Sequence, residues 1–226
     1  MKQLEIIYES PSFVVINKPA GLAVQGGKGI TVSLDSILEK AWSQGHFLVH
    51  RLDRDTSGLV LVAKTKTAAA WFSRYLGESK GGILPADRRI VKRYLAVCRG
   101  RPASAEGIIN LELDIRGRTK KSETRYRLLT AEDQYRSCSI TSLLELEPGT
   151  GRMHQIRRHL ALAGTPVIGD DKYGDFTLNH QLRKSMKLRH LLLHASQLII
   201  PETPEGSAPL NLNAPLPDYF SQFLAQ

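Results

Sequence analysis

Eight short apolar runs, alternating or continuous, are the feature of this 226-residue chain that most constrains its fold. Each run is bounded by turn residues, which is the pattern of β-strands. They cover residues 4–8, 13–16, 59–63, 90–98, 108–113, 124–130, 139–145 and 191–200. Because these runs outnumber the helical segments and do not alternate regularly with them, the sequence predicts an α+β fold rather than a doubly wound sheet.

Four helices are predicted between the strands. The first has Thr67 as its N-cap, an apolar stripe at helical spacing over residues 68–76, and Gly77 at its end. The second covers residues 153–163 and ends at Gly164, with Arg157 at the edge of its buried face, able to reach inward. The other two cover residues 178–186 and 218–224, and residues 78–88 and 201–217 are predicted to be loops.

One loop carries residues suited to chemistry. The sequence HRLDRDTSG at residues 50–58 places Asp53 among arginines, hydroxyls and a turn glycine, directly before an apolar strand that can hold the loop rigidly. The same residue types also occur in ordinary turns and surface ion pairs. Asp55 is a competing carboxylate, and in an extended loop it would point the same way as Asp53.

The charge of the chain suits a polyanionic partner. There are 31 Lys and Arg against 22 Asp and Glu, which gives a formal net charge of +9, and the basic residues gather around residues 88–101, 116–127 and 152–158. We expect phosphate contacts from these groups, with solvated strand and loop faces as the alternative.

Cysteine and histidine spacing argues against a disulfide framework or a metal site. Cys98 and Cys138 lie in separate apolar strand-like contexts and are expected to be core thiols. Four histidines, at positions 50, 154, 159 and 194, lack the spacing of metal ligands and are expected to orient loops through hydrogen bonds. The sequence shows no export signal or transmembrane run, so a soluble cytoplasmic protein is expected.

Several sequence blocks together resemble one protein family. HRLDRDTSG with its following strand resembles the signature of the RluA-type family of RNA pseudouridine synthases. Further blocks resemble the family in the same order, and together they cover nearly the whole chain: the Asn-Lys-Pro-x-Gly turn at 17–21, Tyr-x-Ala at 94–96, GRMHQIRRH at 151–159, PVIGD at 166–170 and LHA at 193–195. The resemblance implies a mixed, largely antiparallel sheet with flanking helices and a central RNA-binding cleft. Residues 1–226 would form a single catalytic domain without a separate N-terminal RNA-binding domain.

The resemblance also implies the activity. The chain would isomerise specific uridines to pseudouridine in RNA, without cofactor or metal, as a monomer. Large-subunit ribosomal RNA is the expected substrate, and transfer RNA is the alternative. A non-catalytic RNA-binding assembly factor and a metal-dependent nuclease are the competing classes, and the nuclease would need more converging carboxylates than Asp53 and Asp55 supply.

Family motifs give site residues their expected roles. Asp53 would be the carboxylate that acts as nucleophile or base, and Arg157 would pair with its ionised form, with a helix-surface phosphate contact as the alternative for Arg157. Tyr94 would stack on the target uracil and Leu193 would form part of the apolar wall behind it.

The remaining expected contacts are with the RNA itself. Arg51 would fill the space that the extruded uridine vacates, with a salt bridge inside its own loop as the alternative. The other residues expected to contact RNA are Lys18, Arg93, Arg152 and Arg158.

Overall fold

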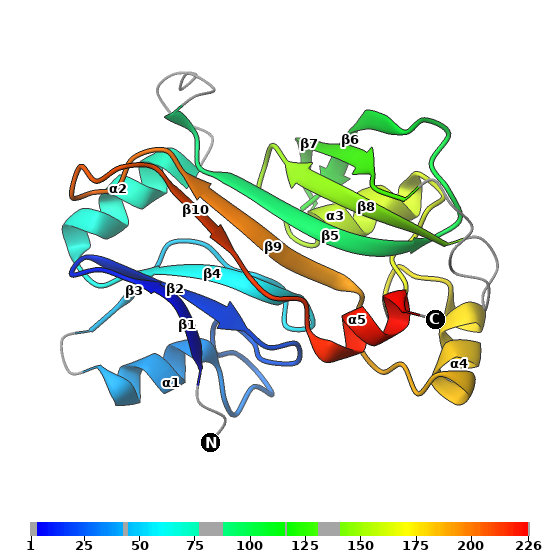
Figure 1. The fold of residues 1–226 in the computed structure, drawn as a ribbon, viewed down its shortest axis with the longest axis horizontal. Helices are drawn as coiled ribbons and strands as arrows, with labels where there is room; N and C mark the ends of the chain where they lie inside the picture. Colours follow the sequence, from blue (N-terminus) through cyan, green and yellow to red (C-terminus); the bar gives the residue numbers. More distant parts are fainter. Residues whose placement is uncertain (1–3, 43–44, 77–87, 116, 131–140, 226) are drawn as a thin grey trace. The chain divides into compact units, whose positions relative to one another are not determined.

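The computed structural model describes residues 4–42, 45–76, 88–115, 117–130 and 141–225. These residues form ten strands and five helices, so the predicted α+β fold is confirmed (Figure 1). The chain divides into two compact units: unit 1 is Met1–Lys92 with Ala195–Pro215, and unit 2 is Arg93–His194 with Leu216–Gln226.

The elements follow one another along the chain without regular alternation of strand and helix. The strands are β1 Glu5–Glu9, β2 Phe13–Lys18, β3 Phe47–Leu48, β4 Ser57–Ala63, β5 Val91–Arg99, β6 Glu106–Asp114, β7 Thr119–Leu128, β8 Thr141–Pro148, β9 Leu193–Ile200 and β10 Leu210–Asn213. The helices are α1 Leu34–Ala41, α2 Lys66–Leu76, α3 Gln155–Leu162, α4 Phe176–Ser185 and α5 Asp218–Leu224.

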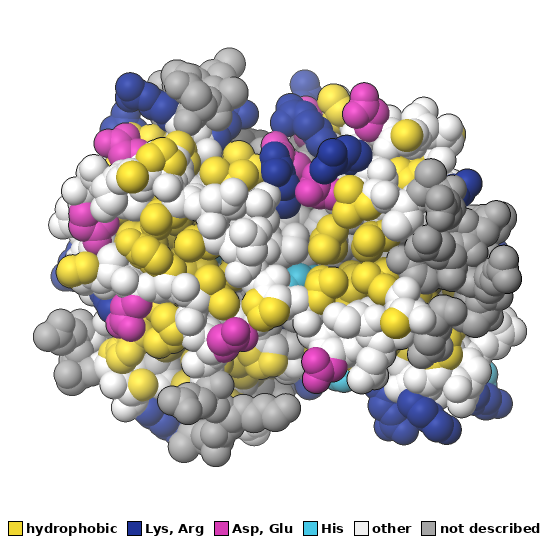
Figure 2. Space-filling view, viewed as in Figure 1, with side chains coloured by type: hydrophobic (Ala, Val, Ile, Leu, Met, Phe, Trp, Pro, Cys, Tyr) yellow, Lys and Arg dark blue, Asp and Glu magenta, His cyan; other side chains and the backbone are white. Residues whose placement is uncertain are grey.

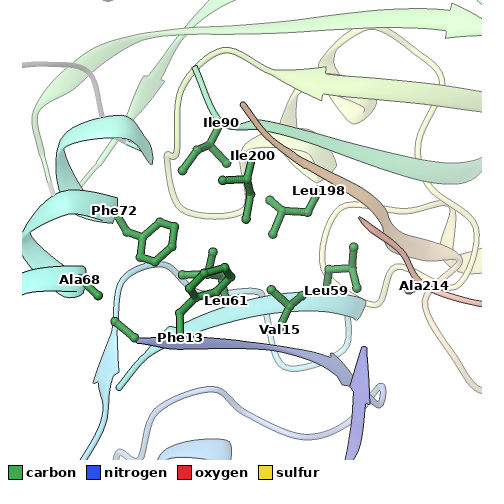
Figure 3. Close-up of a cluster of buried hydrophobic side chains, with 11 residues drawn as sticks. Phe13, Val15, Leu59, Leu61, Ala68, Phe72, Ile90, Leu198, Ile200 and Ala214 are labelled. Carbon is green, nitrogen blue, oxygen red and sulfur yellow. The ribbon is translucent and has the colours of Figure 1, made fainter. Parts of the chain in front are cut away.

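In unit 1 the strands run in the order β1-β2-β4-β9, with β3 added on β4 and β10 on β9. Every residue of β4 is buried, which explains why its sequence is a continuous apolar run rather than an alternating one. Phe13, Leu61 and Phe72 meet in the core of this unit, where α2 covers the sheet (Figure 3). Phe72 meets Phe13 edge to face, with ring centroids 5.0 Å apart.

Gly58 determines how closely β4 can approach β9. Its φ is +106°, a conformation that disfavours any side chain. A Cβ atom at this position would lie 2.2 Å from the carbonyl oxygen of Ala195. The glycine that ends the HRLDRDTSG block is therefore required by backbone packing within unit 1, directly after the Asp53 loop.

Unit 2 contains the antiparallel order β5-β8-β7-β6. One face of this sheet is covered by α3, which contacts β6, β7 and β8. On the other face, Val97 and Leu143 pack into a core cluster with side chains of α4 and α5, including Leu182 and Phe220. Two helical layers therefore enclose part of this sheet.

The predicted strands and helices are confirmed with boundary shifts of up to five residues, and the two-residue strand β3 was not predicted. The N-cap of α2 is Thr65, not Thr67: its hydroxyl accepts a hydrogen bond from the Ala68 N–H at 3.1 Å. The short helix α1, with a capping box formed by Ser33 and Ser36, was not predicted. Residues 77–87, residues 139–140 of a predicted strand, and Cys138 lie outside the described residues.

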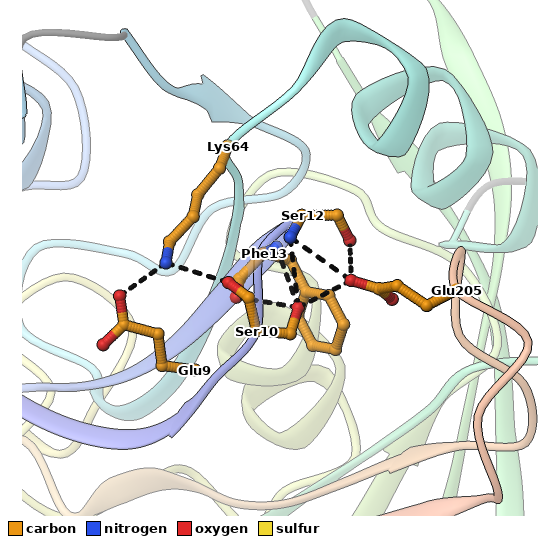
Figure 4. A network of polar contacts seen from close by, with 6 residues as sticks. All are labelled: Glu9, Ser10, Ser12, Phe13, Lys64 and Glu205. Carbon is orange, nitrogen blue, oxygen red and sulfur yellow. Dashed lines mark hydrogen bonds and ion pairs between the residues drawn. The ribbon is translucent and has the colours of Figure 1, made fainter.

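The segment 201–217, predicted to be a loop throughout, contains β10 and is tied to the N-terminal hairpin. The Glu205 carboxylate accepts hydrogen bonds from both hydroxyls of Ser10 and Ser12 and from the Ser12 N–H (Figure 4). Lys64 completes this network by donating to the Ser10 carbonyl oxygen at 2.9 Å and pairing with Glu9. Polar contacts therefore fix a segment whose composition alone indicates a loop.

Candidate active site

The Asp53 loop is a tight turn in unit 1. The Asp53 carbonyl oxygen accepts a hydrogen bond from the Thr56 N–H at 3.2 Å, so residues 53–56 reverse direction instead of extending. Asp53 is half-buried, whereas Asp55 and Arg51 are exposed. The two carboxylates, which an extended loop would place on one side, therefore have different environments.

The buried side chain of Lys18 holds this turn in place. Its side chain is fully buried, and its ammonium group donates hydrogen bonds of 2.8 to 3.0 Å to the carbonyl oxygens of Leu22, Pro19 and Arg54. Burial lowers the pKa of Lys18 to about 7, although the charges of Asp55 and Asp53 oppose this shift. The expected RNA contact of Lys18 is corrected here, because all three ammonium protons are already directed at backbone carbonyls.

His50 holds the other side of the loop. Its Nε2 accepts a hydrogen bond from the Leu61 N–H of β4 at 2.9 Å. Burial lowers the pKa of His50 to about 3, and the charge of Lys92 adds to this effect. The imidazole is therefore neutral, with its proton on Nδ1, and it orients the loop through a hydrogen bond as expected.

Tyr94 and Leu193, the residues expected to contact uracil, both belong to unit 2 and are both buried. Tyr94 pairs with Leu146 across the β5–β8 ladder. Strand alternation places the Tyr94 side chain opposite to that of Val97, on the face that α3 covers. Leu193 directly follows Leu192, whose backbone bonds to Val97 and Ile168.

Arg157 lies in α3 and is buried, as its position on the helix predicted. It forms a bidentate ion pair with Asp170, with Nε to Oδ2 and Nη2 to Oδ1 both at 2.7 Å. The ring of Tyr173 lies 5.3 Å from the guanidinium carbon. Burial alone would raise the pKa of Asp170, but hydrogen bonds from Arg157 and from the N–H groups of Lys172 and Tyr173 outweigh it and lower that pKa. A surface phosphate contact by Arg157 is therefore disfavoured.

A buried polar network attaches α3 to β7. His159 is fully buried, with Nε2 at 2.8 Å from the Ser122 hydroxyl and Nδ1 at 2.9 Å from the Thr124 hydroxyl. The Ser122 hydroxyl donates to the Leu111 carbonyl oxygen, so it must accept from His159 Nε2–H. Gln155 donates to Thr124, which leaves the Thr124 proton for His159 Nδ1. All four side chains thus fit a single proton arrangement with a neutral His159.

The arginines of unit 2 that were expected to contact RNA lie in two places. On one face of the β5-β8-β7 sheet the arginines pair with glutamates: Arg93 with Glu147, Arg125 with Glu123 and Glu147, and Arg127 with Glu145. Figure 2 shows basic and acidic side chains next to one another in the region of β7 and β8. Arg93, expected to contact RNA, is therefore part of a charge-neutralised face.

The other arginines expected to contact RNA lie beside the β6–β7 hairpin. Arg152 donates to the Lys121 carbonyl oxygen at 3.4 Å, and Arg158 donates to the Asp114 carbonyl oxygen at 2.8 Å. These bonds use neutral acceptors, so the positive charges of both guanidinium groups are not cancelled by them.

The described residues include no cluster of three or more potential metal ligands among His, Cys, Asp and Glu. Cys98 is buried, as expected for a core thiol, and burial raises the pKa of its thiol above the usual range. Within the same part of the chain, no helix is long and apolar enough to cross a membrane.

Comparison with known proteins decides between the classes that the geometry leaves open. The family model described as RNA pseudouridylate synthase matches residues 12–162. The chain belongs to this family. It is 35% identical to ribosomal large subunit pseudouridine synthase C of Rickettsia prowazekii, over 96% of this chain and 69% of the relative, and 38% identical to the Rickettsia felis protein of that name, over 96% and 68%.

Solved structures agree with this assignment. The human RNA pseudouridylate synthase domain containing 4 protein superposes with a TM-score of 0.73 at 27% identity, over 97% of this chain and 91% of that one. The human domain containing 1 protein gives a TM-score of 0.68 at 26% identity, over 99% and 95%. The pseudouridine synthase fold inferred from the motifs is thus confirmed, and the chain is an RNA pseudouridine synthase.

Sequence reasoning missed two features of this synthase. Asp170 stands in the PVIGD block but was given no role, although a carboxylate after a glycine in a family motif was a usable signal. Lys18 was expected to contact RNA from a rigid turn beneath the site, but its ammonium group binds backbone carbonyl oxygens instead. Its three backbone partners come from Pro19, Leu22 and Arg54, the last of which is distant in sequence.

Proposed function

We propose that this synthase isomerises uridines of large-subunit ribosomal RNA and that Asp53 is its catalytic carboxylate. The relatives named above are ribosomal large subunit synthases, which supports the choice of RNA. The observation that carries the choice of residue is the geometry of the Asp53 turn. Lys18 holds this turn through the Arg54 carbonyl oxygen, and within it Asp53 is half-buried whereas its neighbour Asp55 is exposed.

The reaction requires no net oxidation or reduction. The bond from ribose C1′ to uracil N1 breaks, a bond from C1′ to C5 forms, and the proton lost from C5 is balanced by one gained at N1. The carboxylate of Asp53 would act in the cleavage step, as nucleophile or as base. Tyr94 would contact the uracil, and Arg157 would keep a nearby carboxylate ionised. Leu193 would contribute an apolar contact to the base.

Arg51 would stabilise the RNA after the uridine leaves its stack, because its planar guanidinium is exposed and adjacent to the turn. Arg158 would contact phosphates, since the hydrogen bond it makes to the Asp114 carbonyl oxygen holds it in place without neutralising it. Arg152, which lies beside the same hairpin, would also contact phosphates.

A pair of isosteric variants tests the proposal. Asp53→Asn should lower isomerisation of an unmodified large-subunit ribosomal RNA transcript by at least about a hundredfold, with RNA affinity retained. Asp55→Asn is the matched control, because both aspartates lie in the same turn and both act on the charge of Lys18. Modified positions are mapped on the transcript and on transfer RNA in parallel.

Equal activity of the two variants would remove Asp53 from the mechanism. Modification of transfer RNA alone would overturn the choice of ribosomal RNA. Binding of RNA without isomerisation by the unsubstituted protein would favour an assembly factor.

A further inference from the structure

We propose that the C-terminal end of α4 is an RNA backbone-binding surface, made of Arg183, Lys184, Lys187 and Arg189, which we call the α4 basic end. This inference rests on the proposed function for its partner, and it adds a surface that no family motif marks. Figure 2 shows Lys and Arg side chains gathered over α4 at the lower right.

The α4 basic end carries an excess of charge that the protein does not neutralise. All four side chains are exposed. Arg183 pairs with Asp171, but among the described residues no ion pair involves Lys184, Lys187 or Arg189. The sheet face of the same unit differs, because each of its arginines there has a glutamate partner.

Compensation of the helix dipole accounts for only part of this charge. Cations stabilise the last turn of a helix, and Arg183 and Lys184 occupy that turn. Lys187 and Arg189 lie beyond Met186, the C-cap residue, where the effect of the dipole falls off. The helix dipole therefore does not account for the lysine and arginine that follow the helix.

The backbone of Lys187 supports a binding role. Its φ is +56°, in the left-handed region, where glycine is usual after a helix. The Leu188 N–H bonds to the Leu182 carbonyl oxygen across this position and closes the helix end. Folding alone would favour glycine here, and the lysine in its place adds an exposed positive charge at the helix end.

Phosphates of the RNA backbone fit this surface. Three exposed cations, for which no ion pair is found among the described residues, suit a chain of negative charges rather than a single small anion. Binding of this kind positions the RNA and carries no sequence information. The α4 basic end would therefore contribute affinity and salt dependence, not chemistry.

Lys187→Gly separates binding from folding. We expect the unfolding temperature to rise by about 2 to 4 °C, because glycine tolerates the left-handed conformation. We also expect RNA affinity to fall about fivefold at 0.1 M salt, and the slope of log K against log salt to decrease by about 0.7 to 0.9 for the lost contact. The probe is the unmodified large-subunit ribosomal RNA transcript.

Lys184→Gln and Lys40→Gln form a matched pair for the same measurements. Both lysines are exposed in the last turn of a helix, and both variants reduce the net charge by one. Only Lys184→Gln should lower the salt slope. Unchanged affinity and slope in both α4 variants, or an equal loss in Lys40→Gln, would overturn the α4 basic end as an RNA surface. Because affinity is measured without turnover, this result is independent of whether the transcript is isomerised.

Discussion

The bidentate pair of Arg157 with Asp170 fixes the plane of a buried guanidinium group. Both hydrogen bonds are 2.7 Å long, and both side chains are excluded from solvent. Two backbone N–H groups further anchor the carboxylate. Asp170 binds Nε and Nη2 of Arg157, so it also sets the orientation of the remaining nitrogen, Nη1. Asp170 itself is not among the proposed catalytic residues.

Asp170→Asn should therefore destabilise the synthase by about 3 kcal/mol, since the asparagine keeps an acceptor for the backbone N–H groups but removes the charge that matches Arg157. Asp171→Asn is the control: its exposed pair with Arg183 should contribute no more than about 0.5 kcal/mol. Urea unfolding of both variants at pH 7 measures the difference. Similar losses of unfolding free energy in the two variants would show that the buried ion pair stabilises the protein no more than the exposed one.

Single residues were predictable where the motif itself assigns them. Asp53, Tyr94 and Arg157 were named from their blocks, and the burial of Arg157 followed from helical spacing. Only the resemblance to the family distinguished Asp53 from Asp55. The residue types alone do not, because they do not reveal the hydrogen bond from the Thr56 N–H to the Asp53 carbonyl oxygen that bends the loop. The roles of the motif residues in catalysis remain proposals that the Asp53→Asn experiment tests.

At the scale of elements, apolar periodicity located the strands and most helices, and it failed where polar contacts replace apolar ones. α1 is short and β10 alternates leucine with asparagine, so neither gives a long apolar signal. The N-cap of α2 differs by two residues because Thr65 and Thr67 are equally good caps in sequence. Capping geometry decides between such candidates only in the folded chain.

The attachment of α3 to β7 depends on one neutral imidazole. His159→Phe should cost about 2 kcal/mol, because it removes two buried hydrogen bonds to Ser122 and Thr124. Burial lowers the pKa of His159 below its usual value, so near and below pH 6.5 the unfolded chain binds a proton that the folded chain does not. Acidification below pH 6.5 should therefore weaken the unsubstituted protein more than His159→Phe.

Urea unfolding of both proteins at pH 7 and pH 5 gives the comparison. The difference in unfolding free energy between them should shrink at the lower pH. Parallel losses would mean that His159 is not held neutral by the network, and the proton arrangement assigned to Ser122, Thr124 and Gln155 would have to change.

Over the whole molecule, the sequence predicted the α+β class and a polyanionic partner, but not which cations remain available to that partner. The net charge of +9 counts every lysine and arginine equally. In the folded protein these cations are not equivalent. Strand register places the arginines of β5 and β7 beside glutamates of β7 and β8, whereas the cations after α4 have no such partners among the described residues. Strand register and helix ends, rather than composition, therefore select the surfaces that can meet phosphate.

An ion-pair swap on the sheet face tests this selection. Arg127→Glu combined with Glu145→Arg keeps the net charge and the cross-strand pair, so stability should change by less than about 0.5 kcal/mol. RNA affinity and its salt slope should also stay at the level of the unsubstituted protein, because a neutralised face releases few counterions on binding. Titration of the ribosomal RNA transcript across a range of salt concentrations measures both. A loss of RNA affinity as large as that of Lys184→Gln would place RNA on this sheet face. The presence or absence of ion pairs would then not indicate where phosphates bind.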